Sequence, residues 1–135
     1  MAEMRIPALK DNLNRVMAFL EEQLELMGCP MKDQMKISLC VEEMFINIAS
    51  YAYGDTPGEA ILDLEPIENP AGVRINLMDR GIPFNPLDRD DPNVTASAEE
   101  RQIGGLGIFL VKKNMDKVSY RYDDGYNIIE MIRYY

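Results

Sequence analysis

The chain has 135 residues, which suits a single domain, and its 47% hydrophobic and 27% charged residues are typical of a soluble globular protein. The net charge of −9 argues against a broad basic surface for DNA or RNA, whereas a nucleotide needs only a few local donors and a metal ion. The sequence contains no histidine, which excludes His-based acid–base catalysis, His metal ligands and histidine phosphorylation within this chain.

The sequence also carries no sign of export. No apolar run approaches the ~20 residues that span a bilayer, and residues 1–10 lack the basic and then apolar order of a secretory signal. The two cysteines, Cys29 and Cys40, fall in apolar helical patterns, which favours buried thiols over a disulfide scaffold. We therefore expect a cytoplasmic protein.

The first elements are a short strand and an amphipathic helix. Residues 3–7 are expected to form the strand, limited by Pro7. Apolar residues then recur with helical period, which predicts a helix from Leu9 to Met27; the recurring positions are Leu9, Leu13, Val16, Met17, Leu20, Leu24 and Met27. Gly28 and Pro30 should end this helix.

A second helix is predicted from about residue 31 to about residue 52, and its middle is apolar on nearly every side, as in a centrally buried helix. This apolar stretch contains Glu42, Glu43 and Asn47. Glu43 and Asn47 are four residues apart and share one face, with Leu39 one turn earlier. Burial of these polar groups is costly unless they are satisfied. They either make helix capping or helix–helix hydrogen bonds, or they wait for a metal ion or a reacting group.

Residues 59–65 and 72–79 alternate as two strands, joined by a hairpin connection at 68–72. The two-residue period places Asp79 on the same face as Ile75 and Leu77, just before Gly81. Asp79 therefore either caps a turn or accepts hydrogen bonds from a ligand held under the sheet.

Residues 82–103 are polar, contain three prolines and suit a mobile flap over a pocket. Gly104, Gly105 and Gly107 then precede a helix in which Leu106, Leu110 and Val111 share one side. Such glycines either hold phosphate at the first helical turn or make a tight turn or close helix–sheet contact. Strands at 117–122 and 126–135 follow, joined by the hairpin signal Asp123-Asp124-Gly125.

The order of these elements predicts an α+β fold. Strands occur in adjacent hairpins rather than alternating with helices, so we expect a two-layer sandwich with a mostly antiparallel mixed sheet and helices on one face. The pocket would lie between the sheet and the helices.

Three separated segments, EEMFIN at 42–47, MDRGIPFNP at 78–86 and IGGLGIFLV at 103–111, occur in an order and spacing that resemble a known family. They resemble the Bergerat-type ATP-binding domain of gyrase-type ATPases, MutL and histidine kinases. The Asp-x-Gly-x-Pro-Phe-x-Pro form and the compact size are most similar to the anti-sigma factor serine/threonine protein kinases. The resemblance covers essentially the whole chain and implies one histidine kinase-like ATPase domain over 1–135, with a flexible ATP lid at about 84–103.

The resemblance implies ATP and Mg²⁺ as cofactors and a role for each matching residue. Asn47 would bind Mg²⁺, and Glu43 would act as general base for the attacking hydroxyl. Asp79 would accept from the adenine amino group, with Gly81 allowing close approach of the base. The main-chain N–H groups at Gly104, Gly105 and Gly107 would contact phosphate. Arg101 of the lid would reach the terminal phosphate.

The sequence departs from the family pattern at Tyr51, where many relatives have histidine, and in extra lid residues before Gly104, which affect the register of Arg101. The implied function is an ATP-dependent kinase that phosphorylates an anti-sigma factor antagonist. The implied partners are that antagonist and a sigma factor, and the resemblance is also compatible with a homodimer. A catalytically inactive, nucleotide-dependent binding module is the alternative, and a two-component sensor kinase is disfavoured by the absence of histidine.

Overall fold

The computed structural model describes residues 2–54, 56, 58–88 and 106–135, and these form a two-layer α+β sandwich. The strands are β1 (Ala2–Pro7), β2 (Glu59–Ile67), β3 (Gly72–Asp79), β4 (Lys117–Asp123) and β5 (Tyr126–Tyr134). The α-helices are α1 (Leu13–Leu26), α2 (Met31–Tyr51) and α4 (Leu106–Asn114), with short 3-10 helices η1 (Lys10–Asn12) and η2 (Pro86–Asp88). The predicted order of strands and α-helices is confirmed.

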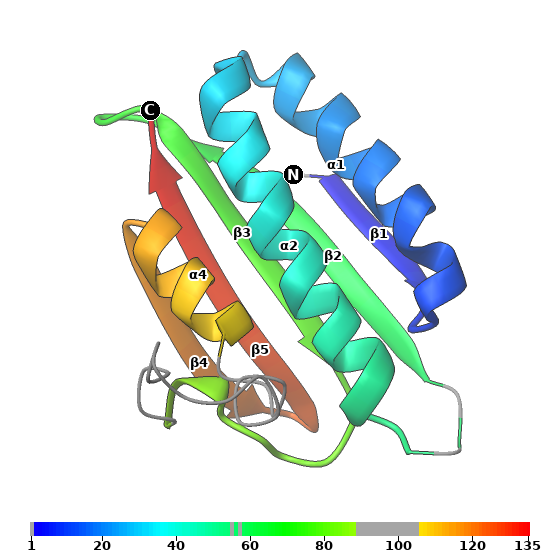
Figure 1. Ribbon diagram of the computed structural model, residues 1–135. Helices are drawn as coiled ribbons and strands as arrows, with labels where there is room; N and C mark the ends of the chain where they lie inside the picture. The colour runs from blue at the N-terminus through cyan, green and yellow to red at the C-terminus, as the bar shows by residue number, and fades with distance from the viewer. Residues whose placement is uncertain (1, 55, 57, 89–105) are drawn as a thin grey trace.

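The five strands form one sheet in the order β1-β2-β3-β5-β4, and all four pairings of these described strands are antiparallel. The three α-helices cover one face of the sheet, with α2 running diagonally across its middle (Figure 1). The expected two-layer arrangement is therefore confirmed. The sheet is antiparallel throughout its described part, whereas we expected a mixed one.

The core lies between α2 and the covered face of the sheet. Phe45 of α2 is fully buried, and alternate residues of the strands pack beneath the helices; these include Leu62, Leu64, Ile75, Leu77 and Met131. Burial of apolar side chains along one helix face and one sheet face is the main stabilising contribution, at roughly 25 cal/mol per Å² of apolar surface.

The first helix begins later than predicted. Leu9 has extended backbone angles (φ −118°, ψ 140°) and is 46% exposed, and η1 follows it before α1 begins at Leu13. The Asn12 side chain donates to the Pro7 carbonyl oxygen at 2.9 Å, which stabilises this turn. Local side-chain-to-backbone bonding of this kind competes with helix at the start of an apolar stripe.

The end of α1 is as predicted. Gly28 adopts φ 77°, its N–H donates to the Glu25 carbonyl at 3.1 Å, and the Cys29 N–H donates to the Leu24 carbonyl at 3.0 Å. These two bonds form a Schellman motif, which needs a residue that tolerates positive φ at Gly28.

The β4–β5 connection confirms the predicted hairpin. Asp124 and Gly125 have φ values of 53° and 82°, which fit the positive φ that a type I′ turn requires at both central positions. The predicted 59–65 and 72–79 hairpin is also confirmed, with Ala60 opposite Asp79 in the register.

One prediction about the region after β3 needs correction. The buried side of α4 includes Ile108 and Val111 and is continued by Met115, whereas Leu110, expected on the same side as Val111, is only half-buried. This helix packs against both the sheet and α2. Its buried face therefore depends on two neighbouring elements rather than on its own apolar pattern alone. The described part of the predicted loop includes η2. None of the helices in the described part of the chain combines the length and the apolar composition of a membrane span.

Candidate nucleotide-binding site

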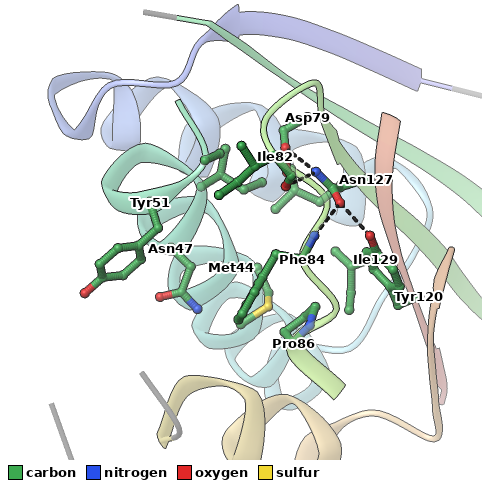
Figure 2. Close-up of a pocket in the computed structure, with 13 residues that line it drawn as sticks. Met44, Asn47, Tyr51, Asp79, Ile82, Phe84, Pro86, Tyr120, Asn127 and Ile129 are labelled. Atoms are coloured by element: carbon green, nitrogen blue, oxygen red, sulfur yellow. Dashed lines mark hydrogen bonds between the residues drawn. The ribbon is translucent and has the colours of Figure 1, made fainter. Parts of the chain in front are cut away.

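A pocket of about 270 Å³ lies between the second half of α2 and the sheet (Figure 2). Its walls come from α2, β3, the segment after β3, and the β4–β5 hairpin. The lining residues include Met44, Asn47, Tyr51, Asp79, Ile82, Phe84, Tyr120, Asn127 and Ile129. The predicted position of the pocket, between the sheet and the helices, is confirmed.

Asp79 forms the polar end of this pocket. It is 8% exposed, and its Oδ1 accepts from the Gly81 N–H at 2.9 Å and from Asn127 Nδ2 at 3.0 Å. Its Oδ2 has no hydrogen bond among the described residues. Asp79 therefore closes a turn through one oxygen, which is the first alternative from the sequence, and it also lines the pocket.

Burial raises the pKa of the Asp79 carboxyl above its ordinary value, while the hydrogen bonds from Asn127 and Gly81 lower it. The cause is desolvation, which disfavours the charged form of a buried acid. A ligand that donates a hydrogen bond to Oδ2 would act in the same direction as Asn127 and favour the carboxylate.

The remaining walls around Asp79 are largely apolar. Met44 and Ile48 come from α2, and Ile129 comes from β5. Ile82 and Phe84 are 70% and 50% exposed, and both line the pocket. A slot with apolar sides and one buried carboxylate suits a flat heterocycle that carries an amino group.

Glu43 and Asn47 lie on the side of α2 that meets the start of α4. A Cβ placed on Gly107 would stand 3.0 Å from Glu43 Oε2 and 3.7 Å from Asn47 Nδ2. Tertiary packing therefore brings the first and third sequence segments together, and a bare backbone at Gly107 leaves room for the Glu43 carboxylate.

Glu43 and Asn47 are half-buried, not fully buried as the apolar surroundings in the sequence suggested. Both residues lie beside the start of α4, and their side chains keep part of their surface exposed to solvent. Neither side chain makes a hydrogen bond or an ion pair within the described part of the chain. Their polar atoms are thus available to a ligand.

Close packing requires a glycine at position 81, which the sequence did not indicate. A Cβ at this position would stand 2.2 Å from the carbonyl oxygen of Ala52, just after α2. The Ile82 N–H donates to that same carbonyl at 3.3 Å. The glycine therefore allows the segment after β3 to pack against the end of α2, which positions the pocket wall.

Two further contacts fix α4 beside α2. Cys40 Sγ lies 3.9 Å from the Leu110 carbonyl oxygen, as expected for a buried thiol that donates weakly. The Arg133 side chain of β5 donates to Asp33 Oδ1 of α2 at 2.9 Å, and it also donates to the Asn114 carbonyl oxygen at the end of α4.

Several residues singled out in the sequence lie outside the described part of the chain. They are Arg101, Gly104, Gly105 and residues 89–103 of the predicted lid.

Sequence reasoning missed the roles of Asn127, Tyr120 and Tyr53. Asn127 carries the same signal that identified Asp79, a polar residue in register with the buried Ile129 and Met131 on an alternating strand. The Tyr53 hydroxyl donates to the Glu59 carbonyl and accepts from the Arg80 N–H, each at 2.6 Å, so it ties the segment after α2 to the start of β2 and to the residue that follows β3. No local pattern indicates such a contact.

This geometry defines a two-layer α+β domain with a largely apolar pocket that is closed at one end by a buried carboxylate. Residues 6–133 match the histidine kinase-like ATPase domain family, and the chain belongs to this family.

Several named proteins are similar to the chain. It is 32% identical over 92 residues to the serine/threonine-protein kinase BtrW of Bordetella bronchiseptica, covering 67% of this chain and 63% of that protein. It is 31% identical over 98 residues to the serine-protein kinase RsbW of Listeria innocua, covering 69% and 61% respectively. It is 27% identical over 137 residues to RsbW of Staphylococcus aureus, covering 93% and 82%. The matches to the first two relatives thus span less than two thirds of their length.

A solved structure supports the fold. A Mycobacterium tuberculosis protein with RsbU and RsbW domains aligns with 99% of this chain at a TM-score of 0.64, over 32% of its own length. The sequence identity is 15%, so this likeness concerns the fold alone.

Proposed function

We propose that the chain binds ATP with Mg²⁺ and transfers the terminal phosphate to a serine or threonine of an anti-sigma factor antagonist. The observation that carries the proposal is the meeting of Glu43 and Asn47 with the backbone of Gly107 beside a pocket that ends at Asp79. The relatives named serine-protein kinases support the reaction type.

The residues of the pocket fit the base of ATP. Asp79 Oδ2 would accept from the adenine amino group, since Oδ1 already has two donors. The apolar walls would hold the two faces of the ring. Gly81 would allow the base to lie close to the backbone, in addition to its packing against Ala52.

Asn47 fits a magnesium site because its side chain lines the pocket and has no hydrogen bond within the described residues. Mg²⁺ takes few protein ligands and keeps several waters, so one amide oxygen is chemically sufficient. When bound, the ion would neutralise phosphate charge, which is the main requirement of phosphoryl transfer.

Glu43 would accept the proton of the attacking hydroxyl. Its half-buried position suits this role because a protein hydroxyl must reach the carboxylate from outside. The N–H groups at the start of α4, with Gly107 in the first turn, would face phosphate oxygens. By resemblance, Gly104, Gly105 and Arg101 would add contacts from the lid at about 84–103.

A second candidate is a binding module that holds its partner in a nucleotide-dependent way without transfer. The observation that favours it is that Glu43 has no orienting hydrogen-bond partner among the described residues. A general base is usually held by such a partner. A sigma factor is the proposed second partner of either form, and a homodimer is compatible with both.

The test is calorimetric titration with ATP and with ADP, each with and without Mg²⁺, followed by incubation with labelled ATP and candidate antagonist proteins. Mg²⁺-dependent binding and label on a partner serine or threonine are expected. Binding without transfer would favour the second candidate. No binding under any condition would contradict both.

A further inference from the structure

The side-chain amide of Asn127 is used entirely by the protein, although it lines the pocket. Asn127 lies directly opposite Asp79 in the β3–β5 register and is 7% exposed. Its Nδ2 donates to Asp79 Oδ1 at 3.0 Å and lies 3.0 and 3.3 Å from the carbonyl oxygens of Ile82 and Gly81 (Figure 2). Both N–H groups of the amide are therefore engaged.

The amide oxygen of Asn127 is engaged as well. It accepts from the Tyr120 hydroxyl of β4 at 2.5 Å and from the Phe84 N–H at 3.1 Å. An amide oxygen has two lone pairs, so no acceptor capacity remains for a ligand. Asn127 cannot form a hydrogen bond to a base without losing one of these bonds.

These bonds determine which atom Asp79 presents to the pocket. Oδ1 has two donors, from a backbone N–H and from Asn127, and rotation of the carboxylate would break both. Hydrogen bonds to a buried charged group contribute more than those between neutral groups, so the observed orientation is strongly favoured. Oδ2 is left as the free acceptor.

We propose that Asn127, held by Tyr120, is a positioning residue for base selection, because it fixes the Asp79 carboxylate with Oδ2 toward the base. This inference rests on the proposed function, since it concerns the adenine end of the same pocket. Adenine has an amino donor where hypoxanthine and guanine have a carbonyl oxygen. A fixed carboxylate oxygen accepts from the first and repels the second.

The same amide also positions two apolar walls. It holds the backbone on both sides of Pro83 through the carbonyl of Ile82 and the N–H of Phe84. The side chains of these two residues line the pocket. Asn127 thus controls the polar end of the pocket and part of its sides from one point on β5.

The test compares dissociation constants of ATP and inosine triphosphate, which carries a carbonyl oxygen in place of the amino group, at fixed Mg²⁺. Asn127→Asp nearly preserves shape but replaces the donor to Asp79 with a second carboxylate. We expect the preference for ATP over inosine triphosphate to fall roughly tenfold or more, as for loss of a hydrogen bond to a charged group. A purely structural defect would weaken the binding of both nucleotides equally and leave the ratio of their dissociation constants unchanged.

Asn76→Asp is the matched control. Asn76 lies on the opposite face of the same sheet and donates to Asp63 Oδ1 at 3.1 Å, so the change places two carboxylates together in the same way. Its nucleotide preference should equal that of the wild type. If Asn127→Asp does not fold, Tyr120→Phe replaces it, and a reduced preference is again expected.

The outcomes separate the two proposals. Wild-type protein that binds neither nucleotide would overturn the proposed function and this inference with it. This inference alone would be overturned if the wild type prefers ATP and Asn127→Asp shows the same preference. If Asn127→Asp does not fold, an unchanged preference in Tyr120→Phe would overturn it.

Discussion

The Glu43 carboxylate lies against the backbone of Gly107: a Cβ on this glycine would stand 3.0 Å from Glu43 Oε2 and 3.5 Å from Glu43 Cβ. These residues come from α2 and α4, which are held side by side by the core. The relationship gives the third glycine of the sequence motif a concrete function, which is to leave space for a carboxylate.

Gly107→Ala should therefore lower phosphate transfer without lowering thermal stability. Alanine favours helix over glycine by up to about 1 kcal/mol, so the melting temperature should stay the same or rise. The added methyl group displaces Glu43, so phosphate transfer to a partner should fall about tenfold, because small misplacements in an active site are costly. Thermal unfolding and a transfer assay measure the two effects, and Lys113→Ala at the far end of α4 is the control. Unchanged transfer would show that the position of Glu43 does not limit the reaction.

Glu43→Gln should retain ATP affinity and lose phosphate transfer, because the amide keeps the shape of the side chain but cannot accept a proton. Loss of a general base typically costs roughly 10²–10⁴-fold in rate. Single-turnover transfer of labelled phosphate is the measurement. Glu42→Gln, on the neighbouring residue of the same helix, should transfer normally. Normal transfer by Glu43→Gln would remove Glu43 from the mechanism.

Asn47→Ala should abolish the part of the ATP affinity that depends on Mg²⁺ while leaving the fold intact. Its side chain is half-buried and makes no hydrogen bond in the described region, so little stability should be lost. Titration of ATP with Mg²⁺ and with EDTA measures the difference. The metal assignment fails if the Mg²⁺ dependence equals that of the wild type.

Asp79→Asn should exchange the base preference of the pocket. The Asn oxygen can keep both hydrogen bonds that Oδ1 accepts, and an N–H donor then replaces Oδ2. Affinity for ATP should fall, and inosine triphosphate should bind better than ATP because its carbonyl oxygen accepts from this donor. Retained ATP preference would mean that Asp79 does not contact the exocyclic group.

The same variant should also change the pH dependence of stability. Because burial raises the pKa of Asp79, the folded protein binds this proton more readily than the unfolded chain does. Ionised Asp79 therefore costs stability, and the cost grows as pH rises from the unfolded pKa through the raised folded value. Asp79→Asn should melt roughly a few degrees higher than the wild type at pH 7, with the difference vanishing below about pH 4. A difference that is independent of pH would contradict this cause.

Much of the local structure was predictable because it depends on neighbouring residues. The β4–β5 turn follows from Asp124 and Gly125, which accept positive φ, and the end of α1 follows from Gly28. The alternation that leads to Asp79 correctly placed it on the buried face of its strand. The late start of α1 was not predictable from the apolar stripe, since the Asn12 side chain bonds to a backbone carbonyl there.

By itself the sequence determined the order of the elements, the buried faces of α1, β2 and β3, and the three segments that indicate the family. Only the tertiary structure decided that Asn127 meets Asp79, that Gly107 lies against Glu43, and that Glu43 is half-buried. The physical reason is that periodicity reports the face a residue occupies on its own helix or strand. Which faces meet depends on strand order and on helix packing between residues far apart in the chain.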